Sequence, residues 1–184
     1  AQLGEVAGRL AAKRAFVVTD PVLVGLGLAD AVAAPLRAAG VTAEVYPGGE
    51  PEPSADAVAR AAAAARDFQP DVVVGLGGGS NLDTAKLVAL LLAHGGSPHD
   101  YAGEDRVPGP VVPLVCVPTT AGTGSEVTQA AVFTDTANHI KLSCLSRHLR
   151  PAVALVDPAL TDGCPRRVTA DSGIDALAHA VEAY

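Results

Sequence analysis

Two residues close to the end of the chain carry side chains that can bind a metal ion. Asp175 and His179 lie four residues apart in SGIDALAHAVEAY. On a helix, this spacing places both side chains on one face, near enough to share an ion. A carboxylate oxygen and an imidazole nitrogen suit Zn²⁺ or Fe²⁺, but two ligands leave such an ion only half held. Spacing alone favours an ordinary ion pair on the helix surface, so the metal interpretation depends on the motifs upstream.

A glycine-rich turn lies in GLGGGSNLDTAK, residues 75–86, between a strand-like run and a helical segment. Glycines at a helix N-terminus leave its N–H groups open to a phosphate or pyrophosphate. Ser80 and Asp83 also have the spacing of a capping box, which would make the segment a well-capped turn without a ligand. Three consecutive glycines exceed what a cap requires and favour phosphate binding, although their spacing departs from the GxGxxG dinucleotide fingerprint.

Two further segments place polar groups at the ends of expected strands. Asp20 closes the first strand, where a carboxylate can accept hydrogen bonds from a ribose diol and would repel a 2′-phosphate. It is equally suited to cap the helix that begins at Pro21. The loop PTTAGTGSEVT, residues 118–128, follows an apolar strand and is rich in glycine and hydroxyl groups. Such a loop suits the close approach of a ligand.

Strand and helix patterns alternate along the chain and must position these groups. Apolar runs predict strands at 15–20, 41–46, 71–77, 110–118 and 151–157, and helical patterns occupy 21–39, 54–68 and about 81–94. Residues 130–135 and 139–145 are typical of a β-hairpin. Near-continuous Val and Leu strands between helices predict an α/β fold: a Rossmann-like parallel sheet with helices on both faces, plus the hairpin. The composition becomes helical from about Pro165.

Composition excludes several classes of function. The 184 residues suffice for one domain or slightly more, and the apolar content of 49% is ample for a core. A net charge of −7 without any basic run argues against nucleic acid as a partner. No apolar stretch has the length of a membrane span, and no signal-peptide pattern opens the chain. Three cysteines outside any CxxC pattern fit reduced thiols in the cytoplasm.

Together these motifs resemble the iron-dependent (group III) alcohol dehydrogenase family of the dehydroquinate synthase-like superfamily. The matching segments are VVTDPVL, GGGSNLDTAK, VPTTAGTGSEVT, SRHLRPAVALVDPALT and TADSGIDALAHAVEAY. The resemblance runs over essentially the whole chain. It implies an NAD-binding α/β domain over residues 1–164. Residues 165–184 would then be the first helix of a truncated all-α, metal-binding domain whose remainder is absent.

The resemblance also implies roles for individual residues. The cofactor-binding residues would be those that match the family's pyrophosphate loop (Gly78, Gly79, Ser80 and Asp83), its ribose-binding acid (Asp20), the loop along the dinucleotide (Thr119, Thr120, Thr123 and Thr128) and two further contacts (Lys141 and Leu160). Asp175 and His179 match the first two of four metal ligands, for Fe²⁺ with Zn²⁺ as the alternative. The other two ligands would be histidines outside this chain. Glu52 stands where relatives commonly carry Asn near the adenosine.

The implied function is that of a metal- and NAD-dependent oxidoreductase that interconverts an alcohol and an aldehyde or ketone by hydride transfer. We expect a small alcohol or aldehyde as substrate, a homodimer or larger homo-oligomer, a cytoplasmic location, and neither nucleic acid nor membrane as a partner. No catalytic residue beyond the metal site is identified. Alternatives on the same scaffold are a maleylacetate reductase, a hydroxyacid–oxoacid transhydrogenase and a dehydroquinate synthase-like lyase. The isolated chain, with half a metal site, is expected to be inactive, and a non-catalytic nucleotide-binding module is a further alternative.

Overall fold

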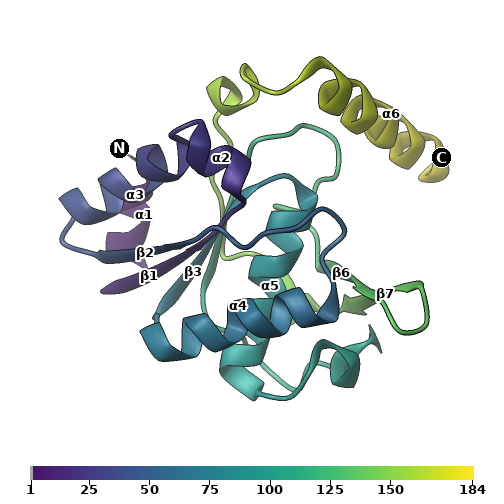
Figure 1. Ribbon diagram of the computed structural model, residues 1–184, viewed down its shortest axis with the longest axis horizontal. Helices are drawn as coiled ribbons and strands as arrows, with labels where there is room; N and C mark the ends of the chain where they lie inside the picture. The colour runs from purple at the N-terminus through teal and green to yellow at the C-terminus, as the bar shows by residue number, and fades with distance from the viewer. Residues whose placement is uncertain (1) are drawn as a thin grey trace.

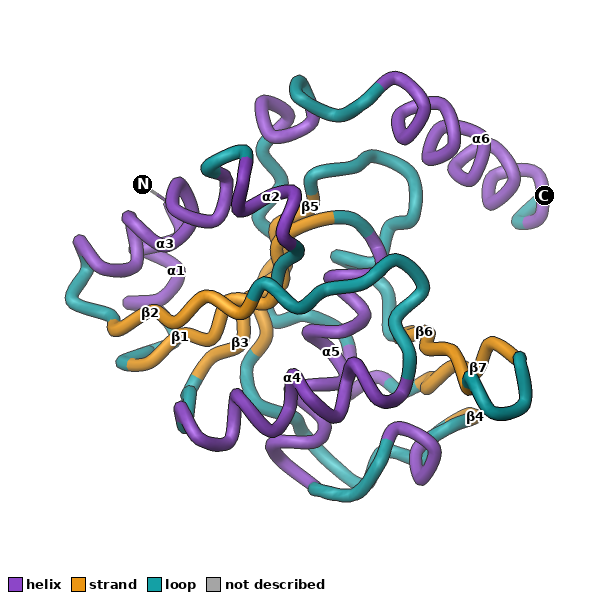
Figure 2. The backbone as a smooth tube through the Cα atoms, in the orientation of Figure 1, coloured by secondary structure: helices purple, strands orange, loops and turns teal. Residues whose placement is uncertain are grey.

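The structure, a computed structural model, describes residues 2–184, and its centre is a five-stranded parallel sheet. The strands are β1 (Arg14–Val18), β2 (Thr42–Tyr46), β3 (Val72–Gly77), β5 (Leu114–Pro118) and β8 (Val153–Ala154). They lie in the order β2-β1-β3-β5-β8, and every neighbouring pair is parallel. The predicted α/β class with a Rossmann-like parallel sheet is confirmed (Figures 1 and 2).

Helices cover both faces of this sheet and bury its side chains in two cores (Figure 1). Helices α1 (Gln2–Arg9) and α3 (Leu28–Ala38) pack on one face, against Val17 and Val74 of the strands. Helices α4 (Ala55–Phe68) and α5 (Gly79–His94) pack on the other face, around Phe16 and Val73. Successive residues of one strand enter opposite cores. For this reason the strands read as continuous apolar runs and not as alternating patterns.

A second, three-stranded sheet of order β4-β7-β6 packs against helix α5. Strands β6 (Ala130–Asp135) and β7 (Ile140–Leu145) form the predicted antiparallel hairpin. The short strand β4 (Gly103–Glu104) pairs with β7 in parallel. Phe133 and Cys144 of the hairpin are buried in the same core as α5. The hairpin therefore anchors the chain where it leaves the hydroxyl-rich loop.

Two predicted helix starts are confirmed by capping hydrogen bonds. The Asp20 carboxylate accepts from the N–H of Leu23 at 2.9 Å and caps the short helix α2 (Pro21–Gly25). The Ser54 hydroxyl accepts from the N–H of Ala57 at 3.1 Å and caps α4. Each satisfies one of the N–H groups that a helix cannot pair internally.

Three predicted elements differ from the structure. The single helix over 21–39 is wrong, because Gly27 adopts a φ of +76° and divides the segment into α2 and α3. This left-handed conformation interrupts helical hydrogen bonding. The strand predicted at 110–118 begins only at Leu114, since Pro110 and Pro113 have no N–H to donate to a ladder. The last strand is reduced to Val153 and Ala154 at the sheet edge, where it has one neighbour.

Helix α6 (Arg166–Glu182) lies apart from both sheets (Figure 1) and has no buried residue. It follows a single helical turn, η3 (Pro158–Thr161). Its N-terminal half reaches the hydroxyl-rich loop, because a Cβ placed on Gly122 would collide with the backbone oxygen of Ser172. The predicted domain division at residues 164 and 165 falls where this helix begins, and it stays a prediction.

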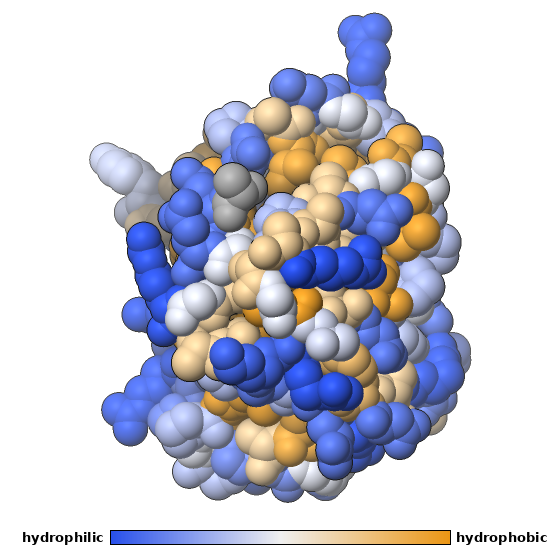
Figure 3. All heavy atoms as spheres, turned by 90° about the vertical axis from the view of Figure 1, so that its left-hand side faces the viewer, coloured by the Kyte–Doolittle hydropathy of each residue, from blue (hydrophilic) through white to orange (hydrophobic). Residues whose placement is uncertain are grey.

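The outer surface over α1 and α3 has hydrophilic and apolar residues interspersed (Figure 3). Across residues 2–184, no helix combines the length and the apolar composition that crossing a bilayer requires.

Candidate functional site

A cavity of about 670 Å³ opens at the carboxyl ends of the parallel strands. Strand β1 has β2 on one side and β3 on the other, so the connections after β1 and β3 lead in opposite directions. At such a switch point the loops diverge and leave a crevice, which is the common ligand position in open α/β sheets. The volume lies within the range of small-molecule sites. The floor of the cavity comes from the ends of β1, β3 and β5, and its walls from α2, residues 49–51 and residues 159–172.

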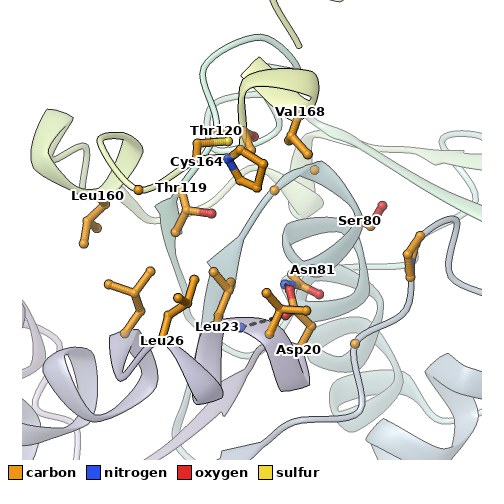
Figure 4. A pocket seen from close by; sticks show the side chains of 18 of the residues that line it. Asp20, Leu23, Leu26, Ser80, Asn81, Thr119, Thr120, Leu160, Cys164 and Val168 are labelled. Atoms are coloured by element: carbon orange, nitrogen blue, oxygen red, sulfur yellow. Dashed lines mark hydrogen bonds between the residues drawn. The ribbon is translucent and has the colours of Figure 1, made fainter. Parts of the chain in front are cut away.

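Most of the predicted cofactor-binding residues line this one cavity, although they come from four separate segments of the chain. They are Asp20, Gly78, Gly79, Ser80, Thr119, Thr120, Thr123 and Leu160. Figure 4 shows the labelled members facing the same space from α2, the start of α5, the end of β5 and the segment before α6. The parallel sheet brings them together because each follows the carboxyl end of a neighbouring strand.

The Asp20 carboxylate is held at the cavity wall by two donors (Figure 4). One oxygen accepts from the N–H of Leu23 at 2.9 Å, and the other accepts from the Nδ2 of Asn81 at 2.7 Å. The capping role predicted for Asp20 is thus confirmed. It leaves the carboxylate accessible to a ligand, since a carboxylate has about four acceptor positions.

The glycine-rich turn connects β3 to α5 and needs glycine for two different reasons. Gly77 has a φ of +140°, a conformation that L side chains rarely adopt. Gly79 is the first residue of α5, and a Cβ there would lie 2.9 Å from the Cγ2 of Thr123. The first N–H groups of this 16-residue helix have no partner inside the helix. They present donors and the positive end of the helix dipole to the cavity, an arrangement that suits a phosphate group.

The capping box that the spacing of Ser80 and Asp83 offered as an alternative is not formed. Helix α5 begins at Gly79, two residues earlier than expected, with Gly78 as its N-cap and no side-chain cap. Ser80 therefore lies inside the first turn and lines the cavity. Asp83 points away from the helix end: its Oδ1 accepts from the Ser125 hydroxyl at 2.6 Å and its Oδ2 from the N–H of Val132 at 3.0 Å.

Asp83 belongs to a buried polar cluster centred on Lys86, a residue with no exposed surface. The Lys86 Nζ donates to the carbonyl oxygen of Ala130 at 2.6 Å, to Ser125 Oγ at 2.9 Å and to Thr128 Oγ1 at 3.2 Å. It lies 3.5 Å from Asp83 Oδ1. Burial lowers the pKa of Lys86, and the Asp83 carboxylate opposes that shift. The cluster ties α5 to the hydroxyl-rich loop and to the start of β6.

Three of the predicted cofactor-binding residues lie outside the cavity lining. Asp83 and Thr128 contact Lys86, and Lys141 on β7 forms an exposed ion pair with Glu52 at 2.6 Å. The glutamate that departs from the family pattern is therefore the partner of this lysine. Direct contact between these three residues and a cofactor stays a prediction.

Asp175 and His179 share one face of α6, with Asp175 Oδ1 and His179 Nε2 3.7 Å apart. Both side chains are about half exposed. Their donor atoms fit two positions of an iron or zinc site. Within residues 2–184, no cluster of three or more His, Cys, Asp or Glu side chains is arranged to hold an ion. The metal role of the pair stays a prediction.

Two residues that organise the site, Asn81 and Lys86, were not predicted from the sequence. Lys86 immediately precedes the apolar helical run LVALLLA, and a single lysine there is ambiguous between a solvated face and a buried ion. Asn81 lies in the first turn of α5, where its type suits capping as well as a contact with Asp20. The partners that tie these residues to the site, Asp20 for Asn81 and Ser125 for Lys86, are distant in sequence, so no local signal shows those contacts.

The fold and the cavity define a class of protein: an open parallel α/β structure that binds its ligand at the carboxyl edge of the sheet. Comparison with known families narrows this class. Residues 1–158 match the model of the family described as iron-containing alcohol dehydrogenase. The chain belongs to the iron-containing alcohol dehydrogenase family, and the resemblance noted in its motifs is confirmed.

Similar sequences and structures agree with this assignment. The chain is 41% identical over 183 residues to the NAD-dependent methanol dehydrogenase of Bacillus methanolicus, covering 100% of this chain and 48% of that protein. It is 47% identical over 184 residues to the long-chain-alcohol dehydrogenase 1 of Geobacillus thermodenitrificans, covering 96% of this chain and 45% of that protein.

Among solved structures, a 1,3-propanediol oxidoreductase superposes with a TM-score of 0.93 at 39% identity, over 97% of this chain and 47% of that one. The sulfoacetaldehyde reductase of Bifidobacterium kashiwanohense, solved in complex with NAD⁺, superposes with a TM-score of 0.92 at 32% identity, over 100% of this chain and 48% of that one. The chain thus spans about half the length of the relatives it matches.

Proposed function

We propose that the chain is the cofactor-binding part of an NAD-linked oxidoreductase that interconverts an alcohol and an aldehyde or ketone. The observation that carries this proposal is that one cavity is lined both by the N-terminus of α5, opened by the glycine-rich turn, and by the Asp20 carboxylate. A pyrophosphate and a neighbouring ribose diol would find complementary groups there together. The NAD-dependent methanol dehydrogenase and the reductase solved with NAD⁺ support the choice of cofactor.

The chain's own residues would bind and orient the dinucleotide. The N–H groups of Gly79 and Ser80 would donate to its phosphates, and Asp20 would accept from its ribose and disfavour a 2′-phosphate. The hydroxyl groups of Thr119 and Thr120 lie at the end of β5 on the cavity floor, where they would fix the part of the cofactor that approaches α6.

Asp175 and His179 would provide two ligands for Fe²⁺ or Zn²⁺. The same helix supplies Val168 and Ser172 to the cavity wall, so α6 connects the cofactor cavity with the metal-binding face. When bound, NAD supplies the hydride acceptor or donor, and the metal supplies a Lewis acid for the substrate oxygen. A catalytic site normally has three protein ligands. The 184-residue chain alone is therefore expected to bind NAD without turnover.

Two measurements test the proposal. Calorimetry with the 184-residue chain should detect NAD⁺ binding, and its absence would refute the cofactor assignment. Turnover is tested on the natural polypeptide that carries these residues, loaded with Fe²⁺ or with Zn²⁺. A panel of methanol, long-chain alcohols, 1,3-propanediol and sulfoacetaldehyde follows the relatives' activities. NADH formation or consumption with at least one member is expected, and none with any metal would refute the oxidoreductase. A homo-oligomeric state and a cytoplasmic location stay predictions.

A further inference from the structure

Asn81 fills a position in which both hydrogens of its side-chain amide are used. Its Nδ2 donates to Asp20 Oδ2 at 2.7 Å and to the carbonyl oxygen of Leu76 at 3.1 Å. The residue is only 4% exposed. An amide buried to this extent and paired on both hydrogens has one orientation, because any rotation would leave a buried donor without a partner. Asn81 thus joins the end of β3 to the carboxylate that follows β1.

The surrounding backbone leaves room for this amide at two places. A Cβ on Gly77 would collide with Asn81 Nδ2, and a Cβ on Gly49 would collide with Asn81 Oδ1. Gly49 itself is held in place by donating its N–H to the carbonyl oxygen of Thr19 at 2.8 Å. Two glycines from separate loops therefore pack directly against one side chain. The amide is a fixed part of the cavity floor.

As a consequence, the Asp20 carboxylate accepts hydrogen bonds from two helices. Leu23 donates to Oδ1 from helix α2, and Asn81 donates to Oδ2 from helix α5. Figure 4 shows these groups next to each other at the cavity wall. With both oxygens already oriented, a ligand that donates two hydrogen bonds to the carboxylate would not have to immobilise it first. Glu50 is the only other charged side chain that lines the cavity within residues 2–184.

We propose that Asn81 is a positioning residue, which aims the Asp20 carboxylate at the adenosine ribose diol of NAD and so makes recognition of a free 2′-hydroxyl possible. This inference rests on the proposed function, since it names the part of the cofactor that Asp20 recognises. Asn81 acts through Asp20, and it need not touch the ligand itself.

The experiment compares two ligands on the 184-residue chain, NAD⁺ and its analogue with 2′-deoxyadenosine. In Asn81→Ala the affinity for NAD⁺ should fall about tenfold, the value of one hydrogen bond to a charged group. The affinity for the 2′-deoxy analogue should fall clearly less than that for NAD⁺, because this analogue offers Asp20 only its 3′-hydroxyl. Equal losses for both ligands would overturn the proposal, since a merely structural role affects them alike.

A matched control exists in the hairpin. Asn138 donates from its Nδ2 to Asp135 Oδ2 at 2.8 Å, so Asn138→Ala removes the same kind of contact far from the cavity. It should leave both affinities unchanged. If Asn81→Ala does not fold, as judged by circular dichroism, Asn81→Leu keeps the side-chain volume and takes its place.

A double-mutant cycle with Asp20→Asn identifies the route of the effect. If Asn81 acts through Asp20, Asn81→Ala should cause no further loss of NAD⁺ affinity in the Asp20→Asn background. Full additivity would overturn the proposal. Failure of the unsubstituted chain to bind NAD⁺ would refute the proposed function. Binding by that chain without ligand discrimination by the variants would refute only the role of Asn81.

Discussion

The Nζ atom of Lys86 lies 2.9 Å from the Oγ atom of Ser125, and this contact joins the helix of the glycine-rich turn to the hydroxyl-rich loop, which also lines the cavity. Both residues are buried. The same ammonium group donates to the carbonyl oxygen of Ala130 at 2.6 Å, so the loop is fixed at the point where it enters β6. The positions of the hydroxyl groups at the cavity therefore depend on a charge that does not itself line the cavity.

Replacing Lys86 with Met should lower the free energy of unfolding by about 3 kcal/mol, because the mostly buried Asp83 carboxylate loses its counter-charge. Met keeps the length of the side chain, so the effect of a cavity is small. Chemical denaturation followed by circular dichroism measures the change. The exposed Lys13→Met is the control and should change stability by less than about 0.5 kcal/mol. Equally small changes in both variants would contradict a stabilising role for the cluster.

Replacing Gly79 with Val should lower NAD⁺ affinity by at least about tenfold, or about 1.4 kcal/mol. A Cβ at this position meets the Cγ2 of Thr123 at 2.9 Å, so the loop must move and the approach of a phosphate to the helix end is obstructed. Calorimetry measures the dissociation constant. Gly8→Val is the control, since a Cβ there meets no atom within 4 Å. Unchanged binding by the Gly79 variant would place the phosphate site elsewhere.

Replacing Asp20 with Gly should narrow the preference for NAD⁺ over NADP⁺. On the proposed role of Asp20, the carboxylate would repel a 2′-phosphate and accept from a free ribose hydroxyl, and the variant would lose both effects. The ratio of the two dissociation constants, measured at one salt concentration, is the readout. Glu50→Gln, which removes the other charge at the cavity, is the comparison for a general electrostatic effect. Tighter binding of NADP⁺ than NAD⁺ by the unsubstituted chain would contradict the assignment of Asp20.

Replacing His179 or Asp175 with Ala in the metal-loaded natural polypeptide should remove metal and turnover together and leave NAD⁺ binding nearly unchanged. Each substitution would take away a proposed metal ligand, whereas the cavity residues are untouched. Metal content by mass spectrometry is measured beside turnover. Asp171→Ala is the control, because Asp171 pairs with Arg167 on the same helix. A His179 variant with full metal content and rate would reduce the pair to a surface contact.

The stability of the chain should fall as pH rises from about 9 to 11, partly because of Cys144. Burial raises the pKa of this thiol from 9.0 to about 11, so between these values the unfolded chain loses a proton that the folded chain keeps. The free energy of unfolding then decreases with pH. Cys144→Ala should lower stability most at neutral pH and show a shallower alkaline decline in denaturation curves.

The control for that experiment is Ala131→Gly, at the residue paired with Cys144 across the hairpin. It should lower the free energy of unfolding by an amount that does not vary with pH, since no titrating group is removed. Parallel alkaline declines in the unsubstituted chain and in Cys144→Ala would show that the thiol does not contribute.

The fold could be predicted from the sequence because its parallel strands are buried on both faces. Adjacent residues such as Phe16 and Val17 enter opposite cores. Because both faces of the strands are buried, the strands are continuous apolar runs, which helical segments separate. The division between α2 and α3 could not be predicted with equal ease. Gly27 is compatible with a helix interior by type, and only its φ of +76° shows the break.

The sequence predicts those cavity residues whose position follows from a local pattern. Asp20 and the glycine-rich turn follow strands, and parallel strands bring their carboxyl ends together. The functions of Asp83 and Thr128 depended instead on Lys86, whose contacts join residues about forty positions apart in the chain. Such long-range pairing leaves no periodic signal in the sequence. The role of Lys86 therefore follows only from the fold, in which the hairpin packs against α5.

The floor of the cavity and parts of its walls differ in the exposure of their side chains. Its floor includes the buried residues Asn81 and Thr119. In the walls, Val22 and Leu26 of α2 are 68% and 60% exposed, and Val168 of α6 is 40% exposed. Substitutions at such positions cost little folding free energy. Substitutions in the walls can therefore change the ligand specificity of the cavity while the parallel sheet beneath it is retained.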